Sequence, residues 1–527
     1  MICLQVERFA DLPVTIQNTG AINVRRNLSV GGIGEPTDYS GFEPCRSRNT
    51  IEHRRQIREV MEQPAQELRN AKESLYGVRY SELLRLPYFD CVRFTIVDPM
   101  HTLFLGTAKR MMEIWLQVSI LTRADLQVAQ NKVDATHVPS NLGRIPFRIA
   151  NSFAGFTAEQ WKAWVTVFSL FALFGHLPDN DYKCWLNFVK ACKLLCKPMI
   201  RIADVGAAHA LLNEFCRDVE KIYGNSRITP NMHMHAHLTN CILDYGPIYS
   251  FWLFSFERYN GILGDYYTNN KSIELQVMRK FIRDQTLRNL EFPEEFKEHF
   301  EHIIDKLDRS NNFDVAVVNG KSVIDTLQLS DDRIDLTSDL WYSVADYSFG
   351  SPHVVESFDD DELQYIADVY KLFLPTISPQ NIPRLYDKYA SVECGGERYG
   401  SKFSRLNRSS FVLARWAGRF DGNVDVETPD ERPGVIRYFV KQSICFGLRK
   451  CTFCFARVSW FQSHPDQFLC GRSGGTPEVW CANLFQCFGS ASFIPVQRIS
   501  RKFIAAYDKV GRENVLYVLP LEKKALI

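Results

Sequence analysis

Apolar residues recur every three or four positions over two long stretches of the chain. Residues 101–121 show this spacing, and residues 157–222 show it again, so both stretches are predicted to be helical. Thr157 precedes the second stretch and Gln160 follows three residues later, which predicts a capping box at its start. The aromatic residues there keep the helical spacing and are interpreted as core rather than as a base-stacking surface: Trp161, Trp164, Phe168, Phe171 and Phe174.

Two further patterns flank the first helical stretch. Residues 51–75 mix arginines with glutamates, which predicts a solvated helix interrupted at Pro64. The β-forming residues around Phe94 and Ile96 predict a short buried strand that stops at Asp98, just before a proline. The order would then be strand, an aspartate at its carboxyl end, and helix.

The last third of the chain changes character twice. Residues 305–365 contain 14 acidic and 4 basic residues, and predict a linker with a short helix from Glu362 to Leu374. From about residue 400, short β-type runs alternate with Gly, Pro, Asn and Asp. The predicted parts are an irregular and helical segment at 1–85, a core at 86–300, a linker and helix at 301–390, and a β-rich domain at 391–527.

Composition narrows the class of protein. The 527 residues include 62 Lys and Arg against 61 Asp and Glu, so a globally basic nucleic-acid coat is excluded and any polyanion site must be local. A hydrophobic content of 46% is typical of a soluble globular chain, and no apolar run is long enough to predict a membrane span. The 15 cysteines, without a secretory signal pattern, predict a reducing, intracellular compartment.

Three groups of residues are candidates for chemistry. Asp98, His101 and Glu257 would suit a magnesium site in which His101 orients Asp98, because Mg²⁺ prefers oxygen ligands. The alternative is structural: an Asp before Pro is more often a turn or cap residue, and Glu257 with Arg258 would start a helix as an ion pair.

The second group is the run His233, His235 and His237. A strand would align all three imidazoles, whereas a helix would align only His233 and His237. Cys192 and Cys196, or Cys184, would supply thiolates for zinc, and a histidine cluster without metal is an equal alternative.

The third group consists of cysteines in the β-rich end, where Cys451 and Cys454 have the spacing of a zinc knuckle. The alternative is that they are small apolar residues of a strand. Its members are Cys445, Cys451, Cys454, Cys470, Cys481 and Cys487. The usual phosphate loops, the nucleophile elbow of hydrolases and the zinc-protease motif do not occur in the sequence.

Three long blocks resemble transposases of the CACTA (En/Spm) group. They are LPYFDCVRFTIVDPMHTLFLGTAKRMMEIWL, IPFRIANSFAGFTAEQWKAWVTVFSLFAL and TPNMHMHAHLTNCILDYGPIYSFWLFSFERYNGILGDYYTNN. The resemblance covers about residues 31–300 and continues more weakly through the β-rich end.

The resemblance implies an α/β plus α fold: a partial RNase H-like core interrupted by an all-helical insertion at about 120–245. An acidic linker and the C-terminal β-rich domain would follow. In such enzymes three acids hold two Mg²⁺ or Mn²⁺ ions for DNA cleavage and strand transfer, and Asp98 and Glu257 match the second and third acids. His233 and His237, with Cys192 and Cys196 as the nearest cysteines, match a structural zinc site of related recombinases.

The first acid of the triad has no counterpart here. The aspartates well upstream of Asp98 are Asp11 and Asp38, and neither lies in a convincing strand. With one acid missing, the resemblance predicts a truncated and catalytically inactive relative. It further implies DNA at transposon ends as the partner, a homo-oligomer, and an intracellular, nuclear location. The alternatives are a domesticated DNA- or protein-binding protein, motivated by 11 basic against 5 acidic residues at 401–460, and an unrelated metalloprotein.

Overall fold

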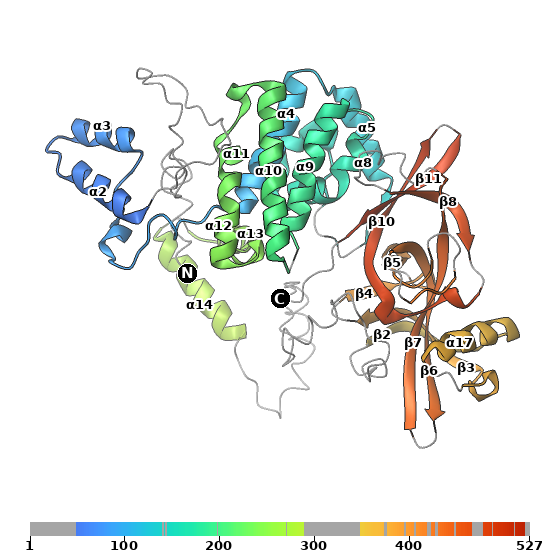
Figure 1. The fold of residues 1–527 in the computed structure, drawn as a ribbon. Coiled ribbons are helices and arrows are strands. Elements are labelled where there is room, and N and C mark those ends of the chain that lie inside the picture. The colour runs from blue at the N-terminus through green and yellow to red at the C-terminus, as the bar shows by residue number, and fades with distance from the viewer. Residues whose placement is uncertain are drawn as a thin grey trace. The chain divides into compact units, whose positions relative to one another are not determined.

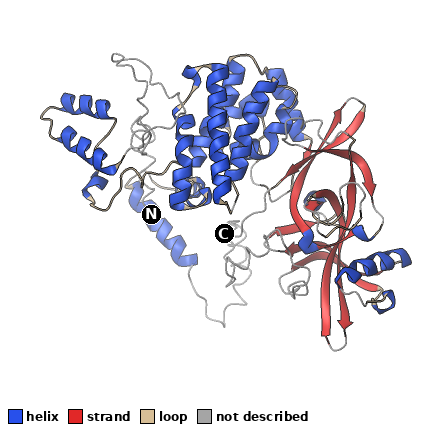
Figure 2. Ribbon diagram, viewed as in Figure 1, coloured by secondary structure: helices blue, strands red, loops and turns tan. Residues whose placement is uncertain are grey.

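The computed structural model describes two stretches of the chain, 49–288 and 348–521. Short gaps within them lie at 140–141, 143–144, 198, 270, 374–376, 395–396, 405–406, 419–422, 427–429, 447–448, 466–477, 487–488 and 511. The described residues fall into two compact units, one of 49–252 with 348–521 and one of 253–288. The first unit contains a helical region, 49–252, and a strand-rich region, 348–521 (Figures 1 and 2).

Helices dominate the helical region, as the apolar spacing predicted. Its longer α-helices are α2 (Thr50–Met61), α3 (Gln66–Tyr76), α4 (Lys109–Gln117), α5 (Arg123–Asp134), α7 (Ala158–Ala163), α9 (Asp179–Leu195), α10 (Ile202–Tyr223) and α12 (Leu238–Tyr245). Shorter ones are α6 (Ile149–Ser152), α8 (Ser169–Leu173) and α11 (Pro230–Met234). Two π-helical segments, η5 (Met100–Ala108) and η7 (Trp164–Phe168), lead directly into α4 and α8, and a 3-10 turn, η9 (His235–His237), follows α11.

Local signals in the sequence explain where several helices begin and end. The side chain of Asn49 accepts from the amide of Glu52 and caps α2, which ends before Pro64. The predicted capping box of Thr157 and Gln160 is confirmed at the start of α7. Because side chains satisfy amides that have no partner within the helix, these boundaries follow from local chemistry.

Large aromatic side chains form the core of the helical region. Trp161, Trp164, Phe168 and Phe171 are buried, which confirms the aromatic stripe as core, while Phe174 is only partly buried. Trp115 of α4 meets Trp185 of α9 edge-on, with ring centroids 5.3 Å apart. Helices α9 and α10 pack side by side in the middle of this region (Figure 1).

The strand predicted around Phe94 and Ile96 is wrong. Residues 91–95 form turns, and Phe94 is 46% exposed. The Asp90 carboxylate accepts from the amides of Val92 and Arg93 at 3.0 and 2.9 Å. These amides are therefore not available to a neighbouring strand, and no strand is found among residues 49–135.

The strand-rich region begins at Ser348, ahead of the boundary at residue 391 that composition suggested. Its strands are β2 (Ser348–Ser357), β3 (Leu385–Cys394), β4 (Glu397–Gly400), β5 (Phe411–Ala414), β6 (Arg432–Phe446), β7 (Arg449–Ser463), β8 (Glu478–Gln486), β9 (Phe493–Pro495), β10 (Ile499–Val510) and β11 (Glu513–Pro520). The predicted helix near 362–374 is α17 (Asp360–Phe373).

Six of these strands pair in a closed antiparallel circuit. β6 pairs with β5 and β7, β7 with β8, β8 with β11, β11 with β10, and β10 with β5. One apolar cluster takes residues from all six strands and fills the circuit: Phe411, Leu413, Val435, Phe461, Trp480, Ala482, Phe503, Ala505, Leu516 and Val518. A second cluster packs Ile366 and Tyr370 of α17 with residues of β6, β7 and β9.

A short strand joins the two regions of the first unit. β1 (Thr136–His137), directly after α5, pairs antiparallel with Ala505 and Ala506 of β10. Phe171 of α8 also meets Tyr517 of β11, with ring centroids 4.9 Å apart.

The second unit consists of α13 (Phe254–Gly264) and α14 (Ile273–Arg288). The Tyr266 hydroxyl donates to the Asp284 carboxylate at 2.5 Å and links the segment after α13 to α14.

Candidate functional site

Asp98 lies where the chain enters η5, and its carboxylate accepts hydrogen bonds from backbone amides there. It accepts from the amides of Met100 and His101 at 3.1 and 2.9 Å, and it contacts the His101 ring nitrogen Nδ1 at 2.6 Å. The Asp98 side chain is 12% exposed, whereas that of His101 is 45% exposed. This is the capping alternative of the sequence analysis: Asp98 satisfies amides at a helix start. The predicted proximity of His101 to Asp98 is present as well.

Glu257 belongs to the other compact unit. It lies exposed in the first turn of α13, and its amide donates to the carbonyl of Leu253 at 2.9 Å. An acid in this position interacts favourably with the helix dipole, which is the structural alternative for this residue.

The magnesium site of Asp98 and Glu257 stays a prediction, because the two residues belong to different compact units. Two ions need several carboxylates that share them, and no group of three or more His, Cys, Asp or Glu side chains in the described ranges is arranged to hold a metal ion. The upstream aspartates, Asp11 and Asp38, lie outside those ranges. We therefore derive no catalytic step through Mg²⁺ or Mn²⁺.

The three histidines of the 233–237 run are helical rather than extended. As the helical alternative predicts, His233 and His237 come together, with ring centroids 5.6 Å apart. His235 instead contacts the hydroxyl of Thr107 at 3.0 Å and stacks against the ring of Phe188. All three side chains are buried.

Burial keeps these imidazoles neutral. Burial, together with the neighbouring His233 and His209, lowers the pKa of His237 to about 4. Burial also lowers the pKa of His235, to about 3. The Nε2 atoms of His233 and His237 and the Nδ1 atom of His209 are buried and have no hydrogen-bond partner among the described residues. His209, which the sequence analysis overlooked, therefore belongs to this cluster.

The cysteines proposed as zinc ligands do not join the histidines. Cys192 near the end of α9 and Cys196, the residue that caps this helix, are both buried, and burial raises the pKa of the Cys192 thiol. The cysteine that approaches a histidine is Cys216, whose Sγ lies 3.7 Å from Nδ1 of His235. Within the described residues, the predicted set of His233, His237, Cys192 and Cys196 is not assembled.

Cys454 is buried in the core beneath α17, on the continuous strand β7, which confirms the strand alternative for this cysteine. Cys481 lies partly buried on β8. Cys445 and Cys451 lie on β6 and β7, whereas Cys470 and Cys487 fall outside the described residues.

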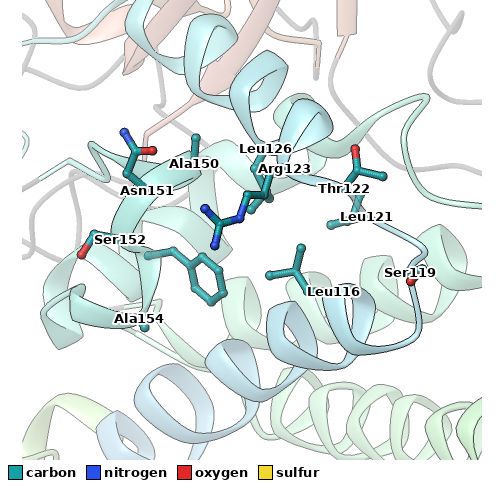
Figure 3. A pocket seen from close by; sticks show the side chains of 11 residues that line it. Leu116, Ser119, Leu121, Thr122, Arg123, Leu126, Ala150, Asn151, Ser152 and Ala154 are labelled. Atoms are coloured by element: carbon teal, nitrogen blue, oxygen red, sulfur yellow. The ribbon is translucent and has the colours of Figure 1, made fainter.

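A pocket of about 470 Å³ opens between α4, the start of α5 and α6. Figure 3 shows Arg123 among its lining side chains, together with Leu116 and Leu126 and with the polar Asn151 and Ser152. A size of this order is typical of small-molecule sites. The sequence carried no motif that marked this pocket.

The basic residues that the structure describes at 401–460 include both buried and exposed ones. Arg432 is buried and donates to the carbonyls of Phe461 and Gly418, so it is structural. Arg457 pairs with Glu362 of α17 at 3.7 Å. Lys402 and Arg408 are exposed and have no ion pair with an acid among the described residues. The basic excess is therefore partly structural and partly a local surface.

No protein-family model, curated protein or solved structure matches this chain. Over the part of the chain that the structure describes, the helices are all too short or too polar to span a bilayer.

Proposed function

We propose that this chain is a CACTA-type transposase relative that binds DNA without cleaving it. The observation that carries the proposal is the agreement of three long sequence blocks with that family, in its order and spacing. The helical structure over about 120–245, the stretch that the resemblance expects as an insertion, supports it. The RNase H-like core remains part of the proposal.

We expect no cleavage because the Asp98 carboxylate already forms hydrogen bonds with the backbone. This carboxylate caps η5 and accepts from two amides, so its oxygens are already engaged by the backbone. Two-metal catalysis depends on carboxylates that place both ions beside the reacting phosphate. Because Asp98, which matches one of the family's acids, caps a helix, we expect the chain to bind DNA without phosphoryl transfer.

DNA binding would come from exposed lysines and arginines that replace counterions along the phosphate backbone. Such binding weakens linearly on a log scale as salt rises, with a slope that counts the phosphates contacted. Residues 401–460 of the strand-rich region, with 11 basic and 5 acidic residues, are the part of the chain that we expect to make these contacts.

The test uses the full chain with a fluorescent duplex and with supercoiled plasmid. We expect salt-dependent binding of the duplex, and no nicking of the plasmid with either Mg²⁺ or Mn²⁺. Nicking that requires metal and disappears in Asp98→Ala would show an active transposase instead. Duplex binding that is absent even at low salt would overturn the proposal and favour the alternative of a protein-binding function.

A further inference from the structure

Four cationic or titratable side chains lie around the start of β5 and the neighbouring part of β6, and none forms an ion pair with an acid among the described residues. Lys402 and Arg437 come together because the amides of residues 402 and 403 donate to the carbonyls of residues 436 and 437, at 2.9 and 3.1 Å. Arg408 lies in the turn that enters β5, and His137 lies on β1, which pairs with β10.

Aromatic rings hold two of these groups in place. The Lys402 ammonium lies 4.8 Å from the centre of the Phe411 ring, and the His137 ring stacks on the same ring at 6.0 Å. His137 also meets Tyr507 edge-on at 5.5 Å. Because Phe411 is fixed in the core of the circuit, these two groups are positioned by the fold rather than free to spread apart.

Arg437 is positioned as well. Its Nε donates to the hydroxyl of Ser459 at 2.7 Å, and its guanidinium lies 5.5 Å from the Phe485 ring centre. Within the described residues, Arg437 contacts no carboxylate, and the same holds for Lys402, Arg408 and His137.

The like charges act on one another. Burial lowers the pKa of His137, and Lys402 and Arg408 lower it further. Burial likewise lowers the pKa of Lys402, with Arg437 acting in the same direction. Positive groups held together without a counter-charge repel one another, and a bound anion would relieve that repulsion.

We propose that Lys402, Arg408, Arg437 and His137 form a phosphate-binding site for the DNA backbone. The guanidinium groups offer paired donors that match phosphate oxygens, and the ammonium adds a point charge. The site rests on the proposed DNA-binding function and specifies which surface carries it. Free phosphate shares the same chemistry and is distinguished by the second part of the test.

The first part compares two double variants of the full chain. Lys402→Gln with Arg408→Gln removes two charges from the site. Lys371→Gln with Arg384→Gln removes two exposed charges from the same strand-rich region, each paired with an acid. Binding of a duplex of about 20 base pairs is measured by fluorescence anisotropy over a range of NaCl concentrations.

Loss of two phosphate contacts should reduce the salt slope by about 1.8 and weaken binding about 60-fold at about 0.1 M salt, since each contact contributes about 0.9 to the slope. The control double variant, Lys371→Gln with Arg384→Gln, should leave both the salt slope and the affinity for the duplex nearly unchanged. Equal losses in the two double variants, or no loss in the first, would overturn the site.

The second part follows thermal unfolding with inorganic phosphate at about 10 mM, against NaCl of equal ionic strength. If the wild type binds no DNA but phosphate raises its Tm, and Lys402→Gln with Arg408→Gln abolishes the rise, the proposed function fails while the site stands. If neither duplex nor phosphate binds the wild type, the site is refuted.

Discussion

Replacing Asp98 separates a capping role from a catalytic one. In the structure its carboxylate accepts from the amides of Met100 and His101 at 3.1 and 2.9 Å and contacts the His101 ring. Asp98→Ala removes all three contacts and leaves two amides at the start of η5 without these acceptors. Asp98→Asn keeps the shape and one carbonyl oxygen, so it keeps part of the cap.

The expected cost follows from these contacts. Loss of an N-terminal cap typically costs about 1 kcal/mol. The contact with His101, whose side chain is 45% exposed, adds at most about 1 kcal/mol. We therefore expect Asp98→Ala to lower the free energy of unfolding by about 2 kcal/mol, and Asp98→Asn by less than about 1 kcal/mol.

The assay is urea unfolding of the full chain, followed by circular dichroism at the helical band. Thr122→Ala, which removes the cap of α5, serves as a reference of about 1 kcal/mol. A metal ligand would behave differently, because Asn and Ala would abolish metal-dependent nicking alike, with little effect on stability. Equal unfolding curves for wild type, Asp98→Asn and Asp98→Ala would refute the capping argument.

Three further predictions concern packing and charge. Gly106→Ala should destabilise the chain by about 1–3 kcal/mol, because the added Cβ would lie 2.7 Å from a backbone carbonyl oxygen, whereas the Cβ added by Gly206→Ala meets open space and should stabilise the chain slightly. Urea unfolding that ranks the two variants in the opposite order would contradict this. Lys502 and Glu397 form an ion pair with both side chains 5% exposed, so Lys502→Met should lower the free energy of unfolding by about 3–5 kcal/mol, and adding Glu397→Leu should recover part of that loss. Additive losses in the double-mutant cycle would contradict this. Burial lowers the pKa of His237 from an ordinary 6.5 to about 4, so between these pH values the unfolded chain binds a proton that the folded chain does not; the stability is complete above about pH 6.5 and falls by about 3 kcal/mol as the pH approaches 4. In His237→Gln, the free energy of unfolding measured with urea should depend less on pH over this range, and an unchanged dependence would contradict the argument.

Several features were predictable because they depend on residues close together in the chain. The capping box of Thr157 and Gln160, the break at Pro64 and the helical pairing of His233 with His237 are local. The strand character of Cys454 was also one of the stated alternatives, and strand β7 bears it out. In each case backbone geometry over one or two turns decides the outcome.

The failures came from partners distant in sequence or from competing side chains. The apolar run around Phe94 has β propensity, but Asp90 takes the nearby amides and no neighbouring strand is present there. Propensity describes what a segment suits, whereas a strand also needs a partner for its hydrogen bonds. The zinc set that includes Cys192 and Cys196 stays a prediction; among the described residues, no group of three or more possible ligands is placed to hold a metal ion.

By itself the sequence determined the helical and strand-rich halves, many helix ends, the near-neutral charge and the resemblance to one transposase group. Only the tertiary structure decided that six strands close on themselves, that Asp98 caps a helix and that His209 joins His233 and His237. The same holds for the gathering of Lys402, Arg408, Arg437 and His137, which come from β1, from β6 and from the turns before β5. The physical reason is that helix periodicity and capping act within a few residues. Strand pairing and charge clustering depend on which distant segments the core brings together.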